Sequence, residues 1–214
     1  MNTFSTFDKE YFFLSLPDDV CIPSLGPDQD TANKPYLTEK LPFGQKPLIF
    51  HNDKLEFSLA RGCIPADSPP DVLFDGDDLV VRGYIAKNLE DMEIPHLAIQ
   101  PAIYIDHKKK WHEDYWFLTF TKRFDCWDKK LSKYDPKPKS WDSSKFNVYA
   151  TVLNAELLHK TPLRERLLFK MGGQTTAPVL VHQSIVNLFS VEGVNVISVE
   201  EEAKESGLLD EAEQ

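Results

Sequence analysis

DVLFDGDDLVVRGYIAKNLEDMEIPHLAIQPAIYI, residues 71–105, is the stretch whose pattern determines the expected fold. Its first apolar run predicts a short strand, after which Asp77 or Asp78 can cap a helix. Apolar side chains then recur at helical spacing, at Val81, Ile85, Leu89 and Met92. We expect this helix to end near Pro95. HLAIQPAIYI, residues 96–105, predicts a second strand with an edge or bulge at its proline.

A second stretch repeats this order of elements. The run VLV at 179–181 is followed by an expected amphipathic helix over 182–192, with Ile185, Leu188 and Phe189 on one face, and a strand over 194–199. Gly193 stands where a helix C-terminus favours the left-handed conformation. The run YWFLTFT at 115–121 is strongly β-prone. Mixed strands with few helices predict an α+β fold: a single domain with a mixed β-sheet and two amphipathic helices in strand–helix–strand units.

Two flanking segments differ in composition from this core. Six prolines between residues 17 and 47 remove backbone donors, so we expect residues 1–70 to form an irregular N-terminal arm packed on the domain. Residues 71–199 form the expected α+β core. Residues 200–214 hold seven acids and one lysine and predict an acidic C-terminal tail outside the core.

The charge balance bears on the class of partner. The 214 residues contain 34 Asp and Glu against 24 Lys and Arg, a net charge of −10. An acidic chain is a poor general binder of nucleic acid, and no apolar run approaches the length of a membrane span. An acidic face can attract a basic protein, although solubility alone also explains the composition. We therefore expect a protein partner and neither nucleic acid nor membrane.

The three cysteines, Cys21, Cys63 and Cys126, are odd in number and widely spaced. This spacing favours reduced thiols in a cytoplasmic protein over a disulfide framework.

Cys126 is the obvious candidate nucleophile, in the stretch TKRFDCWDKKLSKYD at residues 121–135. Asp125 and Asp128 would raise the pKa of its thiol and oppose thiolate formation. A buried, structural cysteine at the corner where a strand ends is the favoured interpretation.

Metal and cofactor motifs are weak. His107 and His112 lie five residues apart across a charged turn, which favours surface histidines over metal ligands. The acidic run DGDD at 75–78 is explained by a turn more simply than by a calcium loop. We therefore expect no catalytic, cofactor-binding or metal-binding residues.

Residues from about 71 to 199 resemble a family of bacterial polymorphic-toxin immunity proteins called immunity protein eleven, formerly a domain of unknown function. The first matching pattern is an Asp-Cys-x-Asp…Ser-x-Tyr strand end. It is followed by a Phe-Lys strand core at 169–170, where the family pattern favours arginine, and by a Gly-Val strand at 193–194. The residues of the strand-end pattern are Asp125, Cys126, Asp128, Ser132 and Tyr134.

The resemblance implies a single α+β domain that binds and neutralises a cognate toxin effector encoded nearby, without catalysis. An acidic face would suit a basic toxin. The candidate partner-binding residues are Asp75, Asp77, Asp78, Asp91 and Glu93. Two alternatives are an adaptor or chaperone for a secreted effector and a cysteine-dependent enzyme centred on Cys126.

Overall fold

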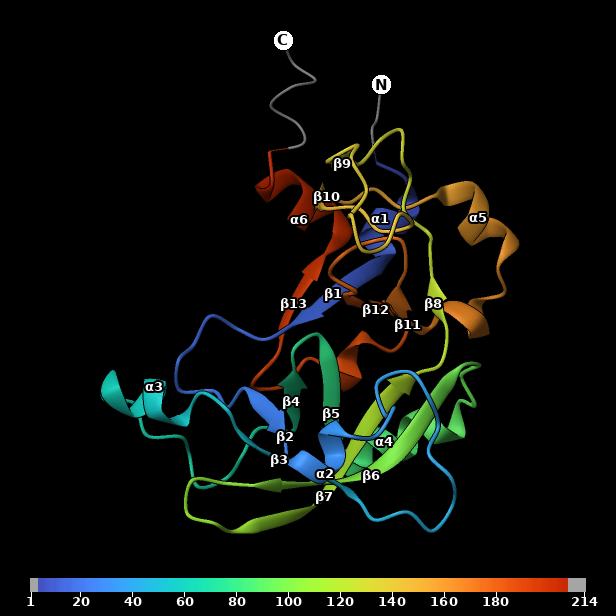
Figure 1. Ribbon diagram of the computed structural model, residues 1–214. Helices are drawn as coiled ribbons and strands as arrows, with labels where there is room; N and C mark the ends of the chain where they lie inside the picture. The colour runs from blue at the N-terminus through green and yellow to red at the C-terminus, as the bar shows by residue number, and fades with distance from the viewer. Residues whose placement is uncertain (1–3, 208–214) are drawn as a thin grey trace. The chain divides into compact units, whose positions relative to one another are not determined.

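The protein has an α+β fold in the computed structural model, which describes residues 4–207 (Figure 1). This result confirms the fold class expected from the sequence. Contacts within the chain group its residues into two compact units. Among the described residues, unit 1 comprises 4–14, 123–187 and 196–207, and unit 2 comprises 15–122 and 188–195. The expected boundaries after residues 70 and 199 do not coincide with the boundaries of these units.

Unit 2 contains a six-stranded sheet in the order β2-β3-β6-β7-β5-β4. Neighbouring strands are antiparallel except for the parallel pair β3 and β6. The strands are β2 (Leu25–Pro27), β3 (Leu48–Asn52), β4 (Val72–Asp75), β5 (Asp78–Arg82), β6 (Leu97–Ile105) and β7 (Trp111–Phe120). The helices are α2 (Gln29–Ala32), α3 (Leu55–Ala60) and α4 (Gly83–Asp91).

The stretch that determines the expected fold forms β4, β5, α4 and β6. β5 and β6 are both antiparallel to β7, which lies between them, so α4 connects two strands that run in the same direction. A strand–helix–strand unit is present, but its first strand is β5 instead of the expected VLF run. The helix begins at Gly83 rather than near Asp78, so Val81 of the expected helical stripe lies in a strand. The reason is the turn at Gly76, whose φ of 60° suits a tight β-hairpin and lets DLVVR pair as a strand.

The proline-rich segment is only partly the irregular arm expected for residues 1–70. Residues 33–47 contain no strand or helix and cover one sheet face, where Tyr36 packs against Phe50 and Phe117. Buried sheet residues hold this segment: Gln100 Oε1 accepts from Leu41 N–H at 2.8 Å, and the Thr119 hydroxyl donates to the Tyr36 carbonyl at 2.7 Å. Residues 11–15, 25–27 and 48–52, however, are strands within the two sheets.

Unit 1 is built on a five-stranded sheet in the order β13-β1-β12-β11-β8, with a separate ribbon of β9 and β10. Its strands are β1 (Tyr11–Ser15), β8 (Arg123–Phe124), β9 (Lys133–Tyr134), β10 (Val148–Ala150), β11 (Leu168–Met171), β12 (Val179–His182) and β13 (Asn195–Ser198). The helices are α1 (Thr6–Glu10), α5 (Ala155–Lys160) and α6 (Val199–Glu205), with short 3-10 helices η1 (Leu163–Arg166) and η2 (Val186–Leu188).

The core of unit 1 is aromatic and includes Tyr11, Trp127 and Phe169. The apolar run YFFLS places β1 between β13 and β12, because its alternate side chains can be buried against this core. Asp8 of α1 is also buried and accepts a hydrogen bond from Leu153 N–H at 2.8 Å. The N-terminal residues of the expected arm are therefore integral to unit 1.

The second expected amphipathic helix, over residues 182–192, is wrong. This segment contains turns and only the 3-10 helix η2, although Ile185 and Phe189 of the predicted apolar stripe are buried. The Ser184 hydroxyl and backbone N–H both lie within hydrogen-bonding distance of His182 Nδ1, at 2.8 and 3.2 Å. Such local side-chain contacts stabilise a turn in competition with helical hydrogen bonds.

The expected acidic tail also differs over its described part. Residues 199–205 form α6, in which Ser198 and Glu201 cap the N-terminus reciprocally and Ala203 is buried. The tail prediction therefore begins too early, because a capping box and small buried side chains keep these acidic residues in unit 1. Residues 208–214 of the predicted tail lie outside the described residues.

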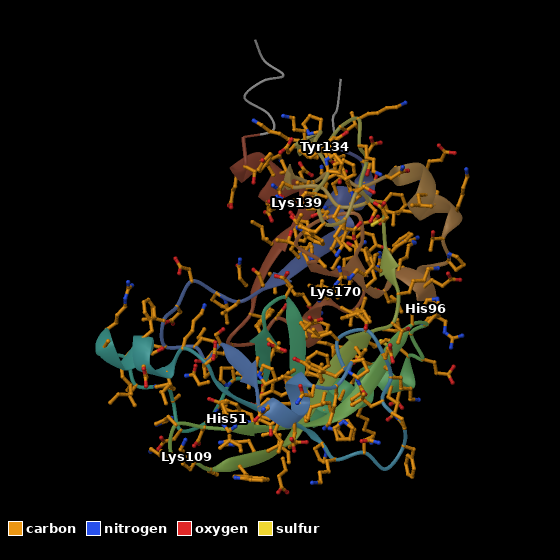
Figure 2. The ribbon with its side chains drawn as sticks, in the orientation of Figure 1. His51, His96, Lys109, Tyr134, Lys139 and Lys170 are labelled. Atoms are coloured by element: carbon orange, nitrogen blue, oxygen red, sulfur yellow. A yellow bond between two sulfur atoms is a disulfide. The ribbon has the colours of Figure 1, made fainter. Side chains whose placement is uncertain are left out.

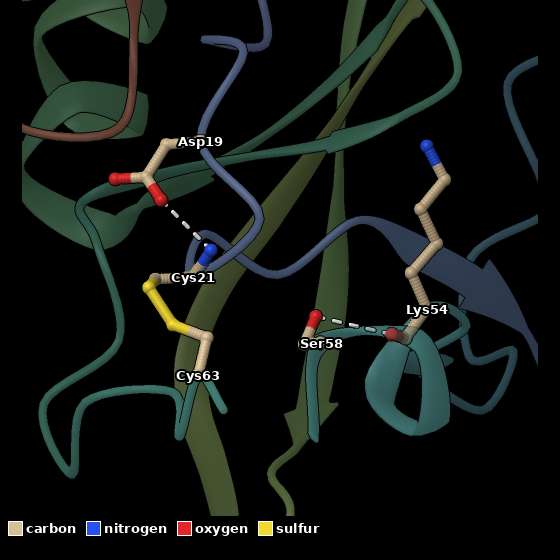
Figure 3. The surroundings of a disulfide bond; sticks show 5 residues. All are labelled: Asp19, Cys21, Lys54, Ser58 and Cys63. Atoms are coloured by element: carbon tan, nitrogen blue, oxygen red, sulfur yellow. Dashed lines mark hydrogen bonds between the residues drawn. A yellow bond between two sulfur atoms is a disulfide. The ribbon is translucent and has the colours of Figure 1, made fainter. Parts of the chain in front are cut away.

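The cysteine prediction is wrong for two of the three thiols. Cys21 and Cys63, both in unit 2, form a disulfide across Cα atoms 5.4 Å apart (Figure 3). The bridge joins the loop before β2 to the segment after α3, where Cys63 N–H donates to the Ser58 carbonyl. The two cysteines are 42 residues apart, and only the fold brings their segments together, so the sequence alone did not predict this disulfide. Within residues 4–207, no helix has the length and apolar character needed to cross a membrane.

Candidate functional site

The negative charge of the chain is concentrated in unit 2. This unit holds 19 Asp and Glu against 11 Lys and Arg, a net charge of −8. The described residues of unit 1 hold 12 acidic and 13 basic side chains, a net charge of +1. An acidic partner-binding surface, as the sequence predicts, is therefore to be sought on unit 2, which contains all five candidate residues.

Three of the five candidates belong to the β4–β5 hairpin. Asp75 and Asp78 face each other across the hairpin end, and Asp77 lies in the turn between them. Asp75 accepts a hydrogen bond from the Tyr36 hydroxyl at 2.7 Å, and Asp78 is only 6% exposed. Burial, together with Asp75, raises the pKa of Tyr36 above its ordinary value, so the tyrosine remains a donor. Asp75 thus helps to hold the segment over the sheet.

Asp91 and Glu93 lie on the opposite face of the same sheet. Tyr36 packs with Val80 and Phe117, whereas α4, which ends at Asp91, packs on β5 and β7 through Ile85 and Leu89. Successive strand residues point to opposite faces, so the hairpin acids do not share a surface with the acids of α4. The structure therefore divides the predicted acidic site between two faces.

A groove runs beside α4 along the sheet. Its larger part encloses about 400 Å³ and its smaller part about 180 Å³, and the two parts share Glu90 and Ile99. The residues of the larger part are Gly83, Ala86, Lys87, Glu90, Asp91, Ile99, Asp114 and Trp116. The smaller part adds Lys40, Leu89, Glu93, Ile94, Leu97 and Ala98. We name this feature the α4 groove.

The α4 groove contains acids that the sequence analysis missed. Glu90 belongs to the same helical run as Asp91, but Asp114 is distant in sequence and comes from β7. A Cβ atom at Gly83 would overlap Asp114 Oδ1, so the missing side chain at this first helical position makes room for the carboxylate. Only the pairing of β5 with β7 places Asp114 beside α4, and no local pattern predicts it.

Cys126 does not have the setting of a nucleophile. The residue is fully buried in the core of unit 1, beside Trp127, which is 3% exposed. Burial first, and Asp125 second, raise the pKa of the Cys126 thiol well above its ordinary value. The Asp128 carboxylate accepts from Lys130 N–H at 2.7 Å, so it stabilises the turn after the strand. The structure therefore favours a structural role for residues 121–135, at the corner where a strand ends, over an active site.

The histidines do not assemble a metal centre in the described part of the chain. His51 and His96 of unit 2 lie far apart (Figure 2), and residues 4–207 contain no group of three or more His, Cys, Asp or Glu able to hold a metal ion. His112 is not the surface residue that its position in a charged turn predicted. It is 8% exposed, and its Nε2 lies 2.8 Å from Asp106 Oδ2.

His182 contacts both a serine and a carboxylate in unit 1. Its Nδ1 lies 2.8 Å from Ser184 Oγ, and its Nε2 lies 3.8 Å from Glu10 Oε2. The hydroxyl and the backbone N–H of Ser184 both approach Nδ1 of His182, two residues earlier in the chain. This arrangement closes a turn. The 3.8 Å separation from Glu10 is too long for a hydrogen bond that would orient a catalytic base.

No model of a known protein family matches the sequence, and no curated protein matches it. The resemblance to the immunity-protein family therefore remains a hypothesis.

Proposed function

We propose that this chain is a non-enzymatic immunity protein that binds a cognate bacterial toxin effector and neutralises it. The observation that carries the proposal is the concentration of negative charge in unit 2, with a net charge of −8. An acidic surface accelerates encounter with a basic protein and disfavours acidic partners. Toxins that act on nucleic acid or nucleotides present a basic surface to their substrates, and an acidic protein can cover that surface.

The sequence resemblance supports the same function through the ordered motifs between residues 71 and 199. The buried thiol of Cys126 weighs against the alternative of a cysteine-dependent enzyme, because a nucleophilic cysteine needs an accessible thiolate. The adaptor or chaperone alternative shares the protein-binding surface and differs in its effect on the toxin.

The cellular compartment in which the chain acts is also part of this proposal. A cytoplasmic location was expected from three free thiols, and the Cys21–Cys63 disulfide removes that support. Disulfides persist in oxidising compartments and are rare in the bacterial cytosol. We therefore propose that the chain meets its toxin in an oxidising compartment, a proposal that the disulfide supports.

A co-expression experiment tests the function. The toxin encoded beside the gene for this chain is expressed in a sensitive cell, with and without the chain, in the cytosol and in the periplasm. Survival that depends on the chain, together with a complex of the two purified proteins, is the expected result. Toxicity that persists in both compartments contradicts immunity for that pair, and binding without rescue identifies the adaptor alternative instead.

A further inference from the structure

The α4 groove has an apolar floor that the helix leaves uncovered. α4 packs on β5 and β7, so Leu97 and Ile99 of β6 are only partly buried and Pro101 is exposed. Trp116 of β7 pairs with Pro101 and is also only partly buried. These side chains alternate with inward-facing core residues and therefore lie on the α4 face of the sheet. An apolar side chain of a partner can be buried on this floor.

The rims of the groove are acidic. Glu90 and Asp91 come from the last turn of α4, Asp114 comes from β7, and Glu93 follows the helix. Lys87 and Lys40 are the lining residues of opposite charge. Within the described residues, no ion pair joins Glu90, Asp91 or Asp114 to a lysine or arginine side chain.

The electrostatic potential of the groove is negative, like the net charge of unit 2. Carboxylates at a helix C-terminus repel the negative end of the helix dipole, which destabilises α4 slightly when the groove is empty. A cation placed beside Glu90 and Asp91 relieves this repulsion. Positive side chains are therefore the favoured partners of the rims, and an apolar side chain is the favoured partner of the floor.

We propose that the α4 groove binds a basic segment of a partner protein, in which Lys or Arg residues flank an apolar side chain seated over Ile99 and Trp116. The nine residues of α4 span about 13 Å, a length that about four extended residues cover. In the proposed function the segment belongs to the toxin, and the inference rests on that function only for the identity of the partner. The binding chemistry itself belongs to the groove.

The test uses a library of random twelve-residue peptides displayed on phage and selected on the full chain at low salt. Enriched peptides are expected to carry an excess of Lys and Arg within a few positions of an aromatic or aliphatic residue. A synthetic peptide from this pool should bind the double variant Glu90→Lys/Asp91→Lys at least about tenfold more weakly than the wild type. The milder variant Glu90→Gln/Asp91→Asn provides the same comparison if charge reversal disturbs folding.

The matched control is Glu56→Lys/Glu113→Lys, which changes the net charge of unit 2 by the same amount at two exposed positions outside the groove. This variant should retain most of the peptide affinity. The inference is overturned if no peptide is enriched, if enriched peptides have no excess of basic residues, or if both double variants lose affinity equally. A wild-type dimer that Glu90→Lys/Asp91→Lys dissociates would also overturn it, because the occupant would then be a second copy.

Failure of this inference is distinguishable from failure of the proposed function. If Glu90→Lys/Asp91→Lys still protects cells from the toxin but no longer binds the peptide, the groove is rejected as the toxin-binding site and the immunity function stands. Peptide binding by the groove without any rescue rejects immunity and leaves the groove as a binding site for basic segments.

Discussion

Cys126 and Asp106 are reactive or charged side chains that stabilise the fold of their units. Cys126 belongs to the aromatic core of unit 1, and Asp106 accepts hydrogen bonds inside the β6–β7 turn of unit 2. The sequence indicated the first outcome, because flanking aspartates disfavour a thiolate. It did not indicate the second, because the contact between Asp106 and His112 depends on the register of β6 and β7.

The thiol of Cys126 should be inert in the native protein. Because the residue is fully buried and the pKa of its thiol is raised, Ellman's reagent at pH 8 should detect no thiol in the folded chain. Unfolding without reductant should release one thiol per chain, since Cys21 and Cys63 are bonded. Cys126→Ser should lower the free energy of unfolding by about 1–3 kcal/mol, because it buries a hydroxyl.

Cys126→Ala is the matched control, since it removes the sulfur without adding a polar atom and should destabilise less than Cys126→Ser. Both variants should keep the affinity for a partner. Rapid native reactivity of the thiol, or lost binding at unchanged stability, would contradict the structural role.

Asp106 should make stability depend on pH. Burial alone would raise the pKa of this carboxyl, but hydrogen bonds from His112 and from the N–H groups of Lys110 and Lys108 hold it below its usual value. A lowered folded-state pKa means that the stabilisation is complete above the unfolded-state value of about 4 and is lost as pH falls through the folded-state value.

Asp106→Asn should therefore lower the free energy of unfolding by about 1–3 kcal/mol at pH 7, and this difference should shrink as the pH falls below about 4. Urea unfolding of both proteins across this pH range measures it. A difference that is independent of pH would show that the variant acts through packing rather than through the charge of Asp106.

At the scale of elements, the sequence predicted strands well where apolar runs are bounded by turn residues. β4, β6, β7, β11 and β12 all correspond to such runs. Ile85 and Leu89 of the predicted apolar stripe are buried in α4, whereas Val81 lies in β5. The segment at 182–192 has the same stripe but forms turns, because Ser184 bonds to His182 instead of continuing a helix. Periodicity therefore identified Ile185 and Phe189 as buried, although Leu188 is only partly buried, but local hydrogen bonding decided the backbone conformation.

The disulfide is the element-scale feature with the largest expected effect on stability. It closes a separation of 42 residues, so its loss should destabilise the chain by about 2–4 kcal/mol. Cys63→Ser and wild type in excess reductant should both show the lower melting temperature, measured by circular dichroism. The variant should be insensitive to reductant. Equal melting temperatures for oxidised and reduced wild type would show that the bridge does not stabilise unit 2.

At the scale of the whole molecule, the net charge of the sequence indicated an acidic protein but not where the acids gather. The fold places an excess of acids in unit 2 and divides the five predicted residues between two sheet faces. Asp91 and Glu93 were predictable because they lie at the C-terminal end of an amphipathic helix and just after it. Asp114 and Trp116 were not, since strand pairing alone places them beside α4. The groove thus depends on tertiary structure that no local pattern encodes.

The central claim is that the acidic surface of unit 2 binds a basic toxin. Its most direct test is the association rate between the purified chain and the toxin encoded beside it, measured by stopped-flow fluorescence over a range of salt concentrations. We predict a one-to-one complex whose association slows steeply as salt increases, and Glu90→Lys/Asp91→Lys should associate more slowly at low salt than Glu56→Lys/Glu113→Lys. No complex, or an association rate that neither salt nor the groove variant changes, would contradict the claim.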